Sequence, residues 1–426
     1  MSRIFLAVFG FFSGVYYYNS MGRWQDMENL QALTERLHAL VLFRALQKDP
    51  VIDAFLQLGE QEGKSKTAQI SNAAAFLHAL FQETDNLTDY VIRLVSTDEN
   101  AYLVRAASNR LTKSYESALD TELTTLQALC DFTFDDLRAA LGFTLPLPPY
   151  ETHPCDLKAI YGEMLDNLSK TGYGIFARYH MFCVKDGVML PVKHPDSQRL
   201  SEFSGYARER SLVIANTKAL LAGDPCNNVL LYGDAGSGKS STVKAIANEF
   251  KSEGLRLIEV KKNELFHLPD IMDALSENPL KFIIFIDDLS FAADDSDFGA
   301  LKAILEGSVS GRSRNIAIYA TSNRRHLVKE NFSDRAGDDL HRQDTIQELT
   351  SLSARFGLKV TFSRPEKKLY EQIVLQLANQ YGVEMPPEEL YIQAEAHALR
   401  NGGRSPRTAK QFIEYLAYCK KDTAQP

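Results

Sequence analysis

The segment Gly233–Ser240 reads Gly-Asp-Ala-Gly-Ser-Gly-Lys-Ser and fits the pattern GxxxxGK[ST] at every fixed position. Glycines in this pattern let backbone N–H groups curl around a phosphate without a clash from a Cβ atom, and the N-terminus of the next helix adds positive potential. A lysine at the place of Lys239 reaches the β- and γ-phosphates of a nucleotide, and a hydroxyl at the place of Ser240 binds Mg²⁺. The segment therefore predicts a phosphate-binding loop.

The chain on either side of this loop has the elements that the motif requires. Asn228–Tyr232 is a short apolar run typical of a strand, and a helical pattern follows from Lys239. A glycine-rich turn that binds nothing is the alternative, and the strand, loop and helix together argue against it. We expect these consecutive residues to bind the nucleotide: Gly233, Asp234, Ala235, Gly236, Ser237, Gly238, Lys239, Ser240 and Ser241.

Two carboxylates follow a second apolar run, Phe282–Ile286, which predicts a buried central strand. Ligands of α/β proteins bind at the carboxyl ends of parallel strands, so Asp287 and Asp288 are expected beside the phosphates. Asp287 would hold Mg²⁺ directly or through water, and Asp288 would position or deprotonate an attacking water. A pair of solvated acids at a strand end is the alternative.

A third strand-like run ends in polar residues at Thr321-Ser-Asn323. If this strand lies between the strand of the loop and the strand of the two acids, Asn323 comes close to the γ-phosphate and can orient water. The signal is weak when taken alone, because Thr-Ser-Asn is also a common turn composition.

These residues need a parallel sheet to bring them together, and the chain after about Leu200 has the required alternation of strands and helices. The pattern predicts an α/β domain with helices on both faces of the sheet. Strands are expected at 228–232, 255–260, 281–286, 316–320 and 358–362, and helices from Lys239, before Asn278, at 299–306 and after Glu366.

The chain before this region divides into two further parts. Apolar residues recur at three- and four-residue steps up to about Leu141, which predicts an all-helical N-terminal domain with caps at Asp85 and Asp98. A proline-rich stretch, a short helix and a hairpin around Asp186-Gly187 follow. The expected domains are 1–144, all helical; 145–200, linker, helix and hairpin; 201–363, phosphate-binding core; and 364–426, helical.

Composition limits the class of protein. The chain has 426 residues and a formal net charge of -8, so it has no overall basic field for nucleic acid. The five cysteines are odd in number and far apart, which favours a reducing, cytoplasmic location without a disulfide framework or zinc site. The apolar run Ile4–Tyr18 is short for a membrane span, so we expect a buried helix; a membrane tether or translation-start artefact is the alternative.

The motifs in their order resemble the AAA+ ATPases, and within them an uncharacterised bacterial family of predicted ATPases catalogued as a domain of unknown function. The resemblance runs from about Arg199 to Tyr418 and includes Ser353–Gly357 (SARFG) and Gly402–Arg407 (GGRSPR) beside the earlier motifs. It implies a P-loop NTPase core of three αβα layers with a C-terminal helical lid. It also implies ATP and Mg²⁺ as ligands and a homo-oligomer.

The resemblance assigns further roles residue by residue. Asn323 would be the first sensor, Arg355 an arginine finger for a neighbouring subunit, and Arg407 the second sensor at the γ-phosphate. Tyr206 lies where such proteins wrap the adenine base, and it either stacks on adenine or belongs to the core. Arg404 and Arg335 are rivals for the arginine roles.

Two residues depart from the usual AAA+ pattern. Asp288 stands where most AAA+ proteins have Glu, and the resulting Asp-Asp pair resembles the initiator and helicase-loader branch. The shorter side chain of Asp288 implies slow hydrolysis and a switch rather than a motor. Ala354 stands where the finger motif often carries an acid, which weakens the assignment of Arg355. We expect Phe266 to pack rather than to thread a substrate, which disfavours an unfoldase.

Three functions remain open at the level of sequence. The first is an oligomeric ATPase that moves its lid against a protein partner bound to the N-terminal helices. The second is an ATP-binding scaffold that does not hydrolyse ATP, suggested by Asp288. The third is a nucleic-acid-associated loader or remodeller, suggested by a local basic set: Arg312, Arg314, Arg324, Arg325 and Lys329.

Overall fold

The computed structural model describes residues 30–60, 64–108, 110–142, 147–289, 299, 301–302, 304–305, 313–323 and 353–423. No helix within these ranges is both long enough and apolar enough to cross a membrane. The described residues form two compact units. One comprises the chain up to Leu94 together with Ser117–Lys158, and the other comprises Val95–Glu116 and the chain from Ala159 onward.

Several sequence-based expectations fall outside the described residues. They concern the apolar run Ile4–Tyr18, part of the helix expected at 299–306, and four of the five residues in the basic set. Arg335, one of the rival arginines, also lies there. The domain boundaries given above stay a prediction.

The first unit is helical, as the apolar periodicity predicts. Leu30, Leu33, Leu37 and Leu40 are all buried, with at most 3% of any of them exposed. Its elements are α1 (Leu30–His38), the 3-10 turn η1 (Arg44–Lys48), α2 (Pro50–Gly59), α3 (Lys66–Phe81), α4 (Leu87–Thr97), α6 (Lys113–Cys130) and α7 (Phe134–Leu141), of which α4 and α6 continue into the second unit.

Two expected helix caps are wrong by one or two residues. Asn86 Oδ1 accepts the N–H of Asp89 at 3.0 Å at the start of α4, so Asn86 takes the place expected for Asp85. Asn100 Oδ1 accepts the N–H of Leu103 at 3.1 Å and caps α5 (Ala101–Ala107), the place expected for Asp98. Asn and Asp are about equally good caps, so the sequence offers neighbouring candidates that only the fold separates.

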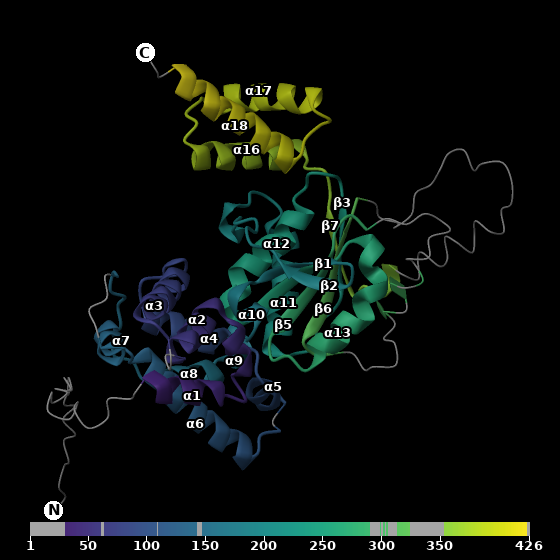
Figure 1. Ribbon diagram of the computed structural model, residues 1–426. Helices are drawn as coiled ribbons and strands as arrows, with labels where there is room; N and C mark the ends of the chain where they lie inside the picture. The colour runs from purple at the N-terminus through teal and green to yellow at the C-terminus, as the bar shows by residue number, and fades with distance from the viewer. Residues whose placement is uncertain are drawn as a thin grey trace, which may run out of the picture. The chain divides into compact units, whose positions relative to one another are not determined.

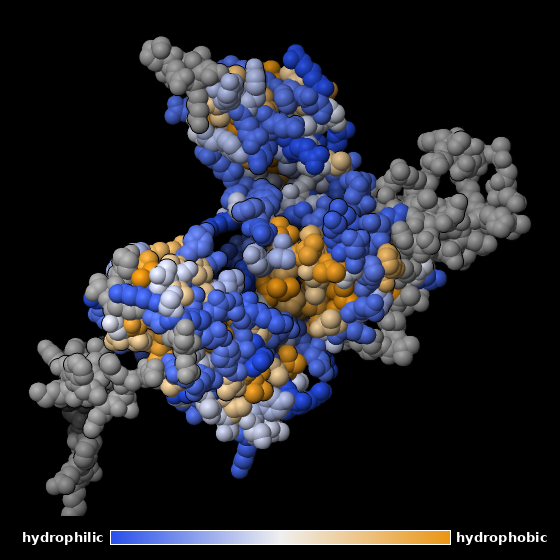
Figure 2. Space-filling model, in the orientation of Figure 1, coloured by the Kyte–Doolittle hydropathy of each residue, from blue (hydrophilic) through white to orange (hydrophobic). Residues whose placement is uncertain are grey.

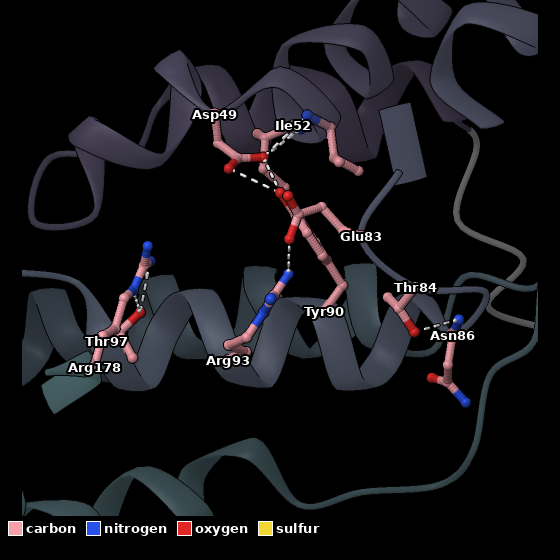
Figure 3. A network of polar contacts seen from close by, with 10 residues as sticks. Asp49, Ile52, Glu83, Thr84, Asn86, Tyr90, Arg93, Thr97 and Arg178 are labelled. Atoms are coloured by element: carbon pink, nitrogen blue, oxygen red, sulfur yellow. Dashed lines mark hydrogen bonds and ion pairs between the residues drawn. The ribbon is translucent and has the colours of Figure 1, made fainter. Parts of the chain in front are cut away.

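One polar network ties two helices of the first unit together (Figure 3). Asp49 caps α2 by accepting the N–H groups of Val51 at 3.0 Å and Ile52 at 3.3 Å. The same carboxylate accepts the hydroxyl of Tyr90 on α4 at 2.7 Å. Because a single side chain satisfies the free N–H groups of one helix and the buried hydroxyl of another, it fixes how the two helices meet.

The second unit contains a seven-stranded sheet in the order β2-β1-β4-β5-β6-β3-β7 (Figure 1). All neighbouring pairs are parallel except β1 and β2, which form the hairpin expected around Asp186-Gly187. The strands are β1 (Met181–Lys185), β2 (Val188–Pro191), β3 (Val229–Gly233), β4 (Leu255–Glu259), β5 (Lys281–Ile286), β6 (Ile316–Ser322) and β7 (Leu358–Phe362).

Helices cover both faces of this sheet, as alternating side chains of β5 show. Ile283 and Phe285 belong to the apolar cluster that contains Val213 and Ile246, from α11 (Ala207–Ala222) and α12 (Lys239–Phe250). The intervening residues of β5 belong to a second cluster with α13 (Leu268–Ser276). The core therefore has three αβα layers, which confirms the fold expected from the sequence.

Shorter elements connect the two units and the strands of the sheet. They are α5, already given, α8 (Leu157–Asp166), α9 (Leu168–Thr171), α10 (Ile175–Arg178), and the 3-10 turns η2 (Leu200–Glu202), η3 (Lys251–Glu253) and η4 (Lys262–His267). The hairpin joins the main sheet through pairing of β1 with β4, which the sequence did not reveal.

Three helices form the expected lid: α16 (Lys367–Tyr381), α17 (Pro387–Arg400) and α18 (Pro406–Thr423). They pack around buried side chains such as Tyr370, Ile373 and Ile413. Ser405 Oγ accepts the N–H of Thr408 at 3.1 Å and caps α18, with Pro406 in the first turn as expected.

The packing expected for Phe266 is wrong. Its side chain is 62% exposed, whereas Leu268 two residues later is fully buried. The 3-10 turn η4 leads directly into α13, and only the side chains that face the sheet are covered. The part of the sequence-based argument against a threading ATPase that rested on Phe266 is therefore removed, whereas the stretch Lys261–Leu280 does hold a helix, α13, as that argument expected.

Apolar surface also gathers over the β1–β2 hairpin (Figure 2). Val188 is 57% exposed and Leu190 is 42% exposed on the edge strand β2. The N–H of Val192 points inward to the carbonyl of Met181, so Pro191 occupies an outward-facing position of the strand. Proline offers no N–H there, which hinders the addition of another strand at this edge.

Candidate functional site

The largest group of predicted site residues lines one cavity of about 430 Å³ in the second unit. The phosphate-binding loop, the ends of β5 and β6, the segment before α11, and helices α16 and α18 all contribute to its wall. The predicted residues that line it are Ala235, Gly236, Ser237, Gly238, Lys239, Ser240, Ser241, Asp287, Asp288, Asn323 and Arg407.

Two glycines of the loop are required by close contacts. Gly233 has φ +139°, and a Cβ atom there would lie 2.1 Å from the carbonyl oxygen of Phe362 at the end of β7. Gly236 has φ +76°, and its Cβ would lie 3.1 Å from Cβ of Arg407. Both backbone conformations are open to glycine and costly for other residues, so the motif's glycines follow from the fold.

Lys239 extends back over the loop. Its Nζ donates to the carbonyls of Gly233 at 2.9 Å and Asp234 at 2.8 Å, and to Oδ1 of Asn323 at 3.1 Å. The side chain is buried, and this burial lowers the pKa of Lys239, while the nearby carboxylates of Asp234, Asp287 and Asp288 act to raise it. A buried ammonium surrounded by oxygen acceptors is the electrostatic partner that a phosphate needs.

The hydroxyl of the loop meets the first carboxylate. Ser240 Oγ donates to Oδ1 of Asp287 at 2.6 Å, and Thr321 Oγ1 donates to the same oxygen at 2.5 Å. Ser240 is the second residue of α12 and Asp287 follows β5, so a helix and a strand of the core place these oxygens together. A hydroxyl beside a carboxylate is a ligand pair that suits Mg²⁺.

The second carboxylate is held in an unusual backbone conformation. Asp288 has φ +53°, and its N–H donates to Thr321 Oγ1 at 2.9 Å. Its Oδ1 accepts from Nδ2 of Asn323 at 2.8 Å. A non-glycine residue in the left-handed region is strained by about 1–3 kcal/mol and persists where the surroundings fix it, which is common at functional sites.

The position of Asn323 follows from strand order. Strand β6 lies between β5 and β3, with Ile286 opposite Ala320 and Tyr232 opposite Ser322. Asn323 is the next residue, so it emerges between the acids and the loop. This is the arrangement on which its predicted place near the γ-phosphate depended.

Arg407 connects the lid to the loop. Its N–H donates to the carbonyl of Gly236 at 3.2 Å, and its side chain lines the cavity. Its rival Arg404 is held elsewhere, because its guanidinium makes a two-pronged ion pair with Glu395 of α17, at 2.8 Å in the shorter contact. The hydrogen bond from Arg404 lowers the pKa of Glu395.

Tyr206 is a core residue rather than a wall of the cavity. It is 6% exposed, its ring centroid lies 5.4 Å from that of Phe362, and its hydroxyl donates to the carbonyl of Ser363. The cavity is lined instead by residues that the sequence reasoning missed: Gln198, Glu202, Phe203, Ser204, Arg210, Ile373, Leu377 and Lys410. An aromatic, Phe203, was present in the right segment, three residues before the one considered.

Two buried hydroxyls show that the cavity suits a polar ligand. Ser204 Oγ and Ser237 Oγ have no hydrogen-bond partner among the described residues, although these residues are only 7% and 3% exposed. Buried polar groups are normally paired, so unpaired ones on a cavity wall point to a ligand. Together with the loop, Lys239, and the Ser240–Asp287 pair, they fit a nucleotide with Mg²⁺.

Arg355 lies apart from these residues. It lies at a turn after the helical residues Ser353 and Ala354, just before β7, and it is not among the residues that line the cavity of its own chain. Its role as an arginine finger stays a prediction.

Solved structures that match this chain include the RuvB Holliday junction branch migration motor of Thermotoga maritima, at 18% identity and a TM-score of 0.35. That match covers 51% of this chain and 63% of the RuvB chain. A mutant of the same RuvB is similar at 17% identity with a TM-score of 0.36, again covering 51% of this chain and 63% of that chain. This chain therefore spans less than two thirds of the length of those proteins.

A search of curated protein sequences found no match. The model of one family, described as "Protein of unknown function (DUF815)", matches residues 176–419, which is more than half of the 426 residues. The match includes the phosphate-binding loop, both carboxylates, Asn323, Arg355 and Arg407. The chain therefore belongs to this family.

Proposed function

We propose that this protein binds ATP with Mg²⁺ and hydrolyses it. The observation that carries the proposal is the 2.6 Å hydrogen bond between Ser240 Oγ and Asp287 Oδ1 on the wall of the 430 Å³ cavity. It brings together the two oxygen groups that a magnesium ion of a nucleotide needs, next to the ammonium of Lys239.

The proposed division of work follows the geometry. The loop amides and Lys239 hold the phosphates, and Ser240 and Asp287 hold Mg²⁺, which supplies charge neutralisation at the phosphate oxygens. Asp288 accepts the proton of the attacking water, and Asn323 orients that water. Arg407 contacts the γ-phosphate from the lid, and Arg355 does so from a neighbouring subunit.

The base would lie against the apolar part of the cavity wall. Phe203 contributes an aromatic ring, and Ile373 and Leu377 of α16 contribute apolar side chains from the lid. These residues would contact the base, which is the role that the sequence suggested for Tyr206. A flat purine ring fits apolar and aromatic walls because they remove its faces from water.

The lid is the element that would transmit the nucleotide state. The N–H of Arg407 donates to the carbonyl of Gly236 in the loop, and α16 contributes Ile373 and Leu377 to the cavity wall, so the lid would contact both the phosphates and the base. We further propose a homo-oligomer, a protein partner that binds the N-terminal helices, and a cytoplasmic location. The five cysteines, all within the described residues, form no disulfide, which supports a reducing compartment.

Two substitutions test the proposal. Lys239→Ala should weaken ATP binding and abolish phosphate release, whereas Asp288→Asn should retain ATP binding and lose phosphate release. Asp273→Asn on the exposed side of α13 is the matched control and should leave both unchanged. Wild-type protein that binds Mg·ATP without releasing phosphate would favour the scaffold alternative. Protein that binds no adenine nucleotide at all would refute the proposal.

A further inference from the structure

Part of the cavity wall is a short segment that lies outside the sheet. We call Asp196–Ser204 the strap; it contains η2 and precedes α11. Gln198, Glu202, Phe203 and Ser204 of the strap line the cavity. What holds the strap in place therefore decides whether the base end of the site is formed.

A single side chain of α12 holds the start of the strap. Asn248 Nδ2 donates to the carbonyl of Asp196 at 2.7 Å and to the carbonyl of Gln198 at 2.9 Å. Both N–H groups of the amide are thus used on strap carbonyls. Asn248 itself is not among the residues that line the cavity.

The remaining oxygen of this amide is fixed from the other side. His180, directly before β1, donates through Nε2 to Oδ1 of Asn248 at 2.9 Å. An amide that flipped would set its oxygen against two carbonyl oxygens and its NH₂ group against the histidine donor. His180 therefore fixes the orientation in which Asn248 can hold the strap.

The end of the strap has separate anchors. Arg210 of α11 donates to the carbonyl of Phe203 at 3.5 Å, and its guanidinium carbon lies 5.2 Å from the centroid of the Phe203 ring. Gln380 of the lid donates to the carbonyl of Glu202 at 3.4 Å. Loss of Asn248 would therefore free the Asp196–Gln198 end and leave the other end attached.

We propose that Asn248 is a positioning residue for nucleotide binding, which holds the strap over the base end of the cavity. The inference rests on the proposed function and deepens it. Helix α12 carries the phosphate loop's lysine at its start and Asn248 about 14 Å further along its axis. One rigid helix therefore sets the distance between the grip on the phosphates and the wall that faces the base.

This geometry separates two parts of the ligand. Lys239 and the loop contact phosphates, so their contribution depends on the phosphates that the ligand carries. The strap faces the nucleoside, so the contribution of Asn248 should be the same for ATP and ADP and absent for a ligand without a nucleoside. Mg·tripolyphosphate is such a probe.

The test compares Asn248→Asp with wild type in the full chain. Aspartate keeps the shape of the side chain and removes both donors. We expect the Kd values for Mg·ATP and Mg·ADP to rise by the same factor, about tenfold for two lost hydrogen bonds, with the Kd for Mg·tripolyphosphate unchanged. We also expect faster amide hydrogen exchange in the strap of the nucleotide-free protein and an unchanged kcat at saturating ATP.

Two further variants serve as controls. Glu249→Gln changes the exposed neighbour of Asn248 and should leave all three Kd values as in wild type. His180→Ala should shift the two nucleotide Kd values in the same direction as Asn248→Asp but less, because the amide keeps its donors; it also tests the network if Asn248→Asp fails to fold.

Unchanged nucleotide Kd values in both Asn248→Asp and His180→Ala would overturn the inference, and so would an equal loss for tripolyphosphate, which would indicate a general disturbance. Failure of wild type to bind ATP while it binds tripolyphosphate would overturn the assignment of the strap to the base. Failure of wild type to bind any of the three probes would instead remove the proposed function.

Discussion

Asn323 donates a 2.8 Å hydrogen bond from Nδ2 to Oδ1 of Asp288. Its own Oδ1 accepts from Lys239 Nζ at 3.1 Å. One amide thus connects the ammonium proposed to hold the phosphates with the carboxylate proposed to act on water. Any water between Asp288 and a bound γ-phosphate would lie within reach of this amide, which gives Asn323 a role in the chemical step rather than in affinity.

Replacement of Asn323 by alanine should therefore slow hydrolysis and spare binding. We expect kcat to fall by about 10²-fold, the size of effect seen when one preorganised polar group is removed from a reacting centre. The Kd for Mg·ATP should stay within about threefold, because the loop amides, Ser240 and Asp287 remain. Steady-state phosphate release and equilibrium binding measure the two quantities, with Asn72→Ala in α3, a residue that does not line the cavity, as control. Equal losses in both would assign Asn323 to binding.

Arg355 should act on the nucleotide of a neighbouring subunit. Arg355→Ala alone and Lys239→Ala alone should each lose ATPase activity, and kcat of Arg355→Ala should fall by about 10³-fold or more. A mixture of the two should recover part of the activity, because some interfaces then pair an intact loop with an intact arginine. The measurement is phosphate release across mixing ratios, together with particle mass in the presence of ATP. A monomer with ATP and no recovery in any mixture would contradict action between subunits.

The site was predictable where its chemistry is local in the chain. The loop Gly233–Ser240 is a contiguous motif, and Asp287 and Asn323 each follow an apolar run that can be identified as a strand. Parallel strands bring such ends to one edge of a sheet, so their meeting follows from the elements alone. These parts of the fold and site were therefore accessible to sequence reasoning.

The base end was not predictable in the same way. The strap has no apolar period, and Asn248 looks like any polar position on the outer side of a helix. Its partners Asp196 and His180 come from distant segments and meet it only through tertiary packing. The exposure of Phe266 was missed for a related reason, since a short 3-10 turn has no face that composition alone can assign.

A buried carboxylate in the second unit predicts a pH-dependent stability. Asp98 is 9% exposed, and burial raises its pKa above 3.8, although a hydrogen bond from Asn100 acts in the opposite direction. Because the pKa of Asp98 is higher in the folded than in the unfolded protein, its contribution to stability is fully present below the unfolded-state pKa. That contribution is lost as the pH rises through the folded-state pKa.

Asp98→Asn should therefore raise the stability of the second unit near neutral pH. The amide keeps an oxygen that can accept from Asn100 and carries no charge to bury. The difference from wild type should shrink as pH falls toward the unfolded pKa, because both side chains are then neutral. Urea unfolding midpoints across this pH range give the measurement, with the exposed Asp166→Asn as control. A constant difference at every pH would show that the charge of Asp98 is not the cause.

The contact between Asp49 and Tyr90 should stabilise the junction of α2 and α4 in the first unit (Figure 3). Tyr90→Phe removes one hydrogen bond and should cost about 1 kcal/mol. Asp49→Ala also removes the cap of α2 and leaves the hydroxyl of Tyr90 unpaired, so it should cost about 2–3 kcal/mol. Because both changes act on the same carboxylate, the double variant should cost no more than about Asp49→Ala alone. Hydrogen exchange of the α2 amides measures these costs locally, and additive losses would show that the two side chains act independently.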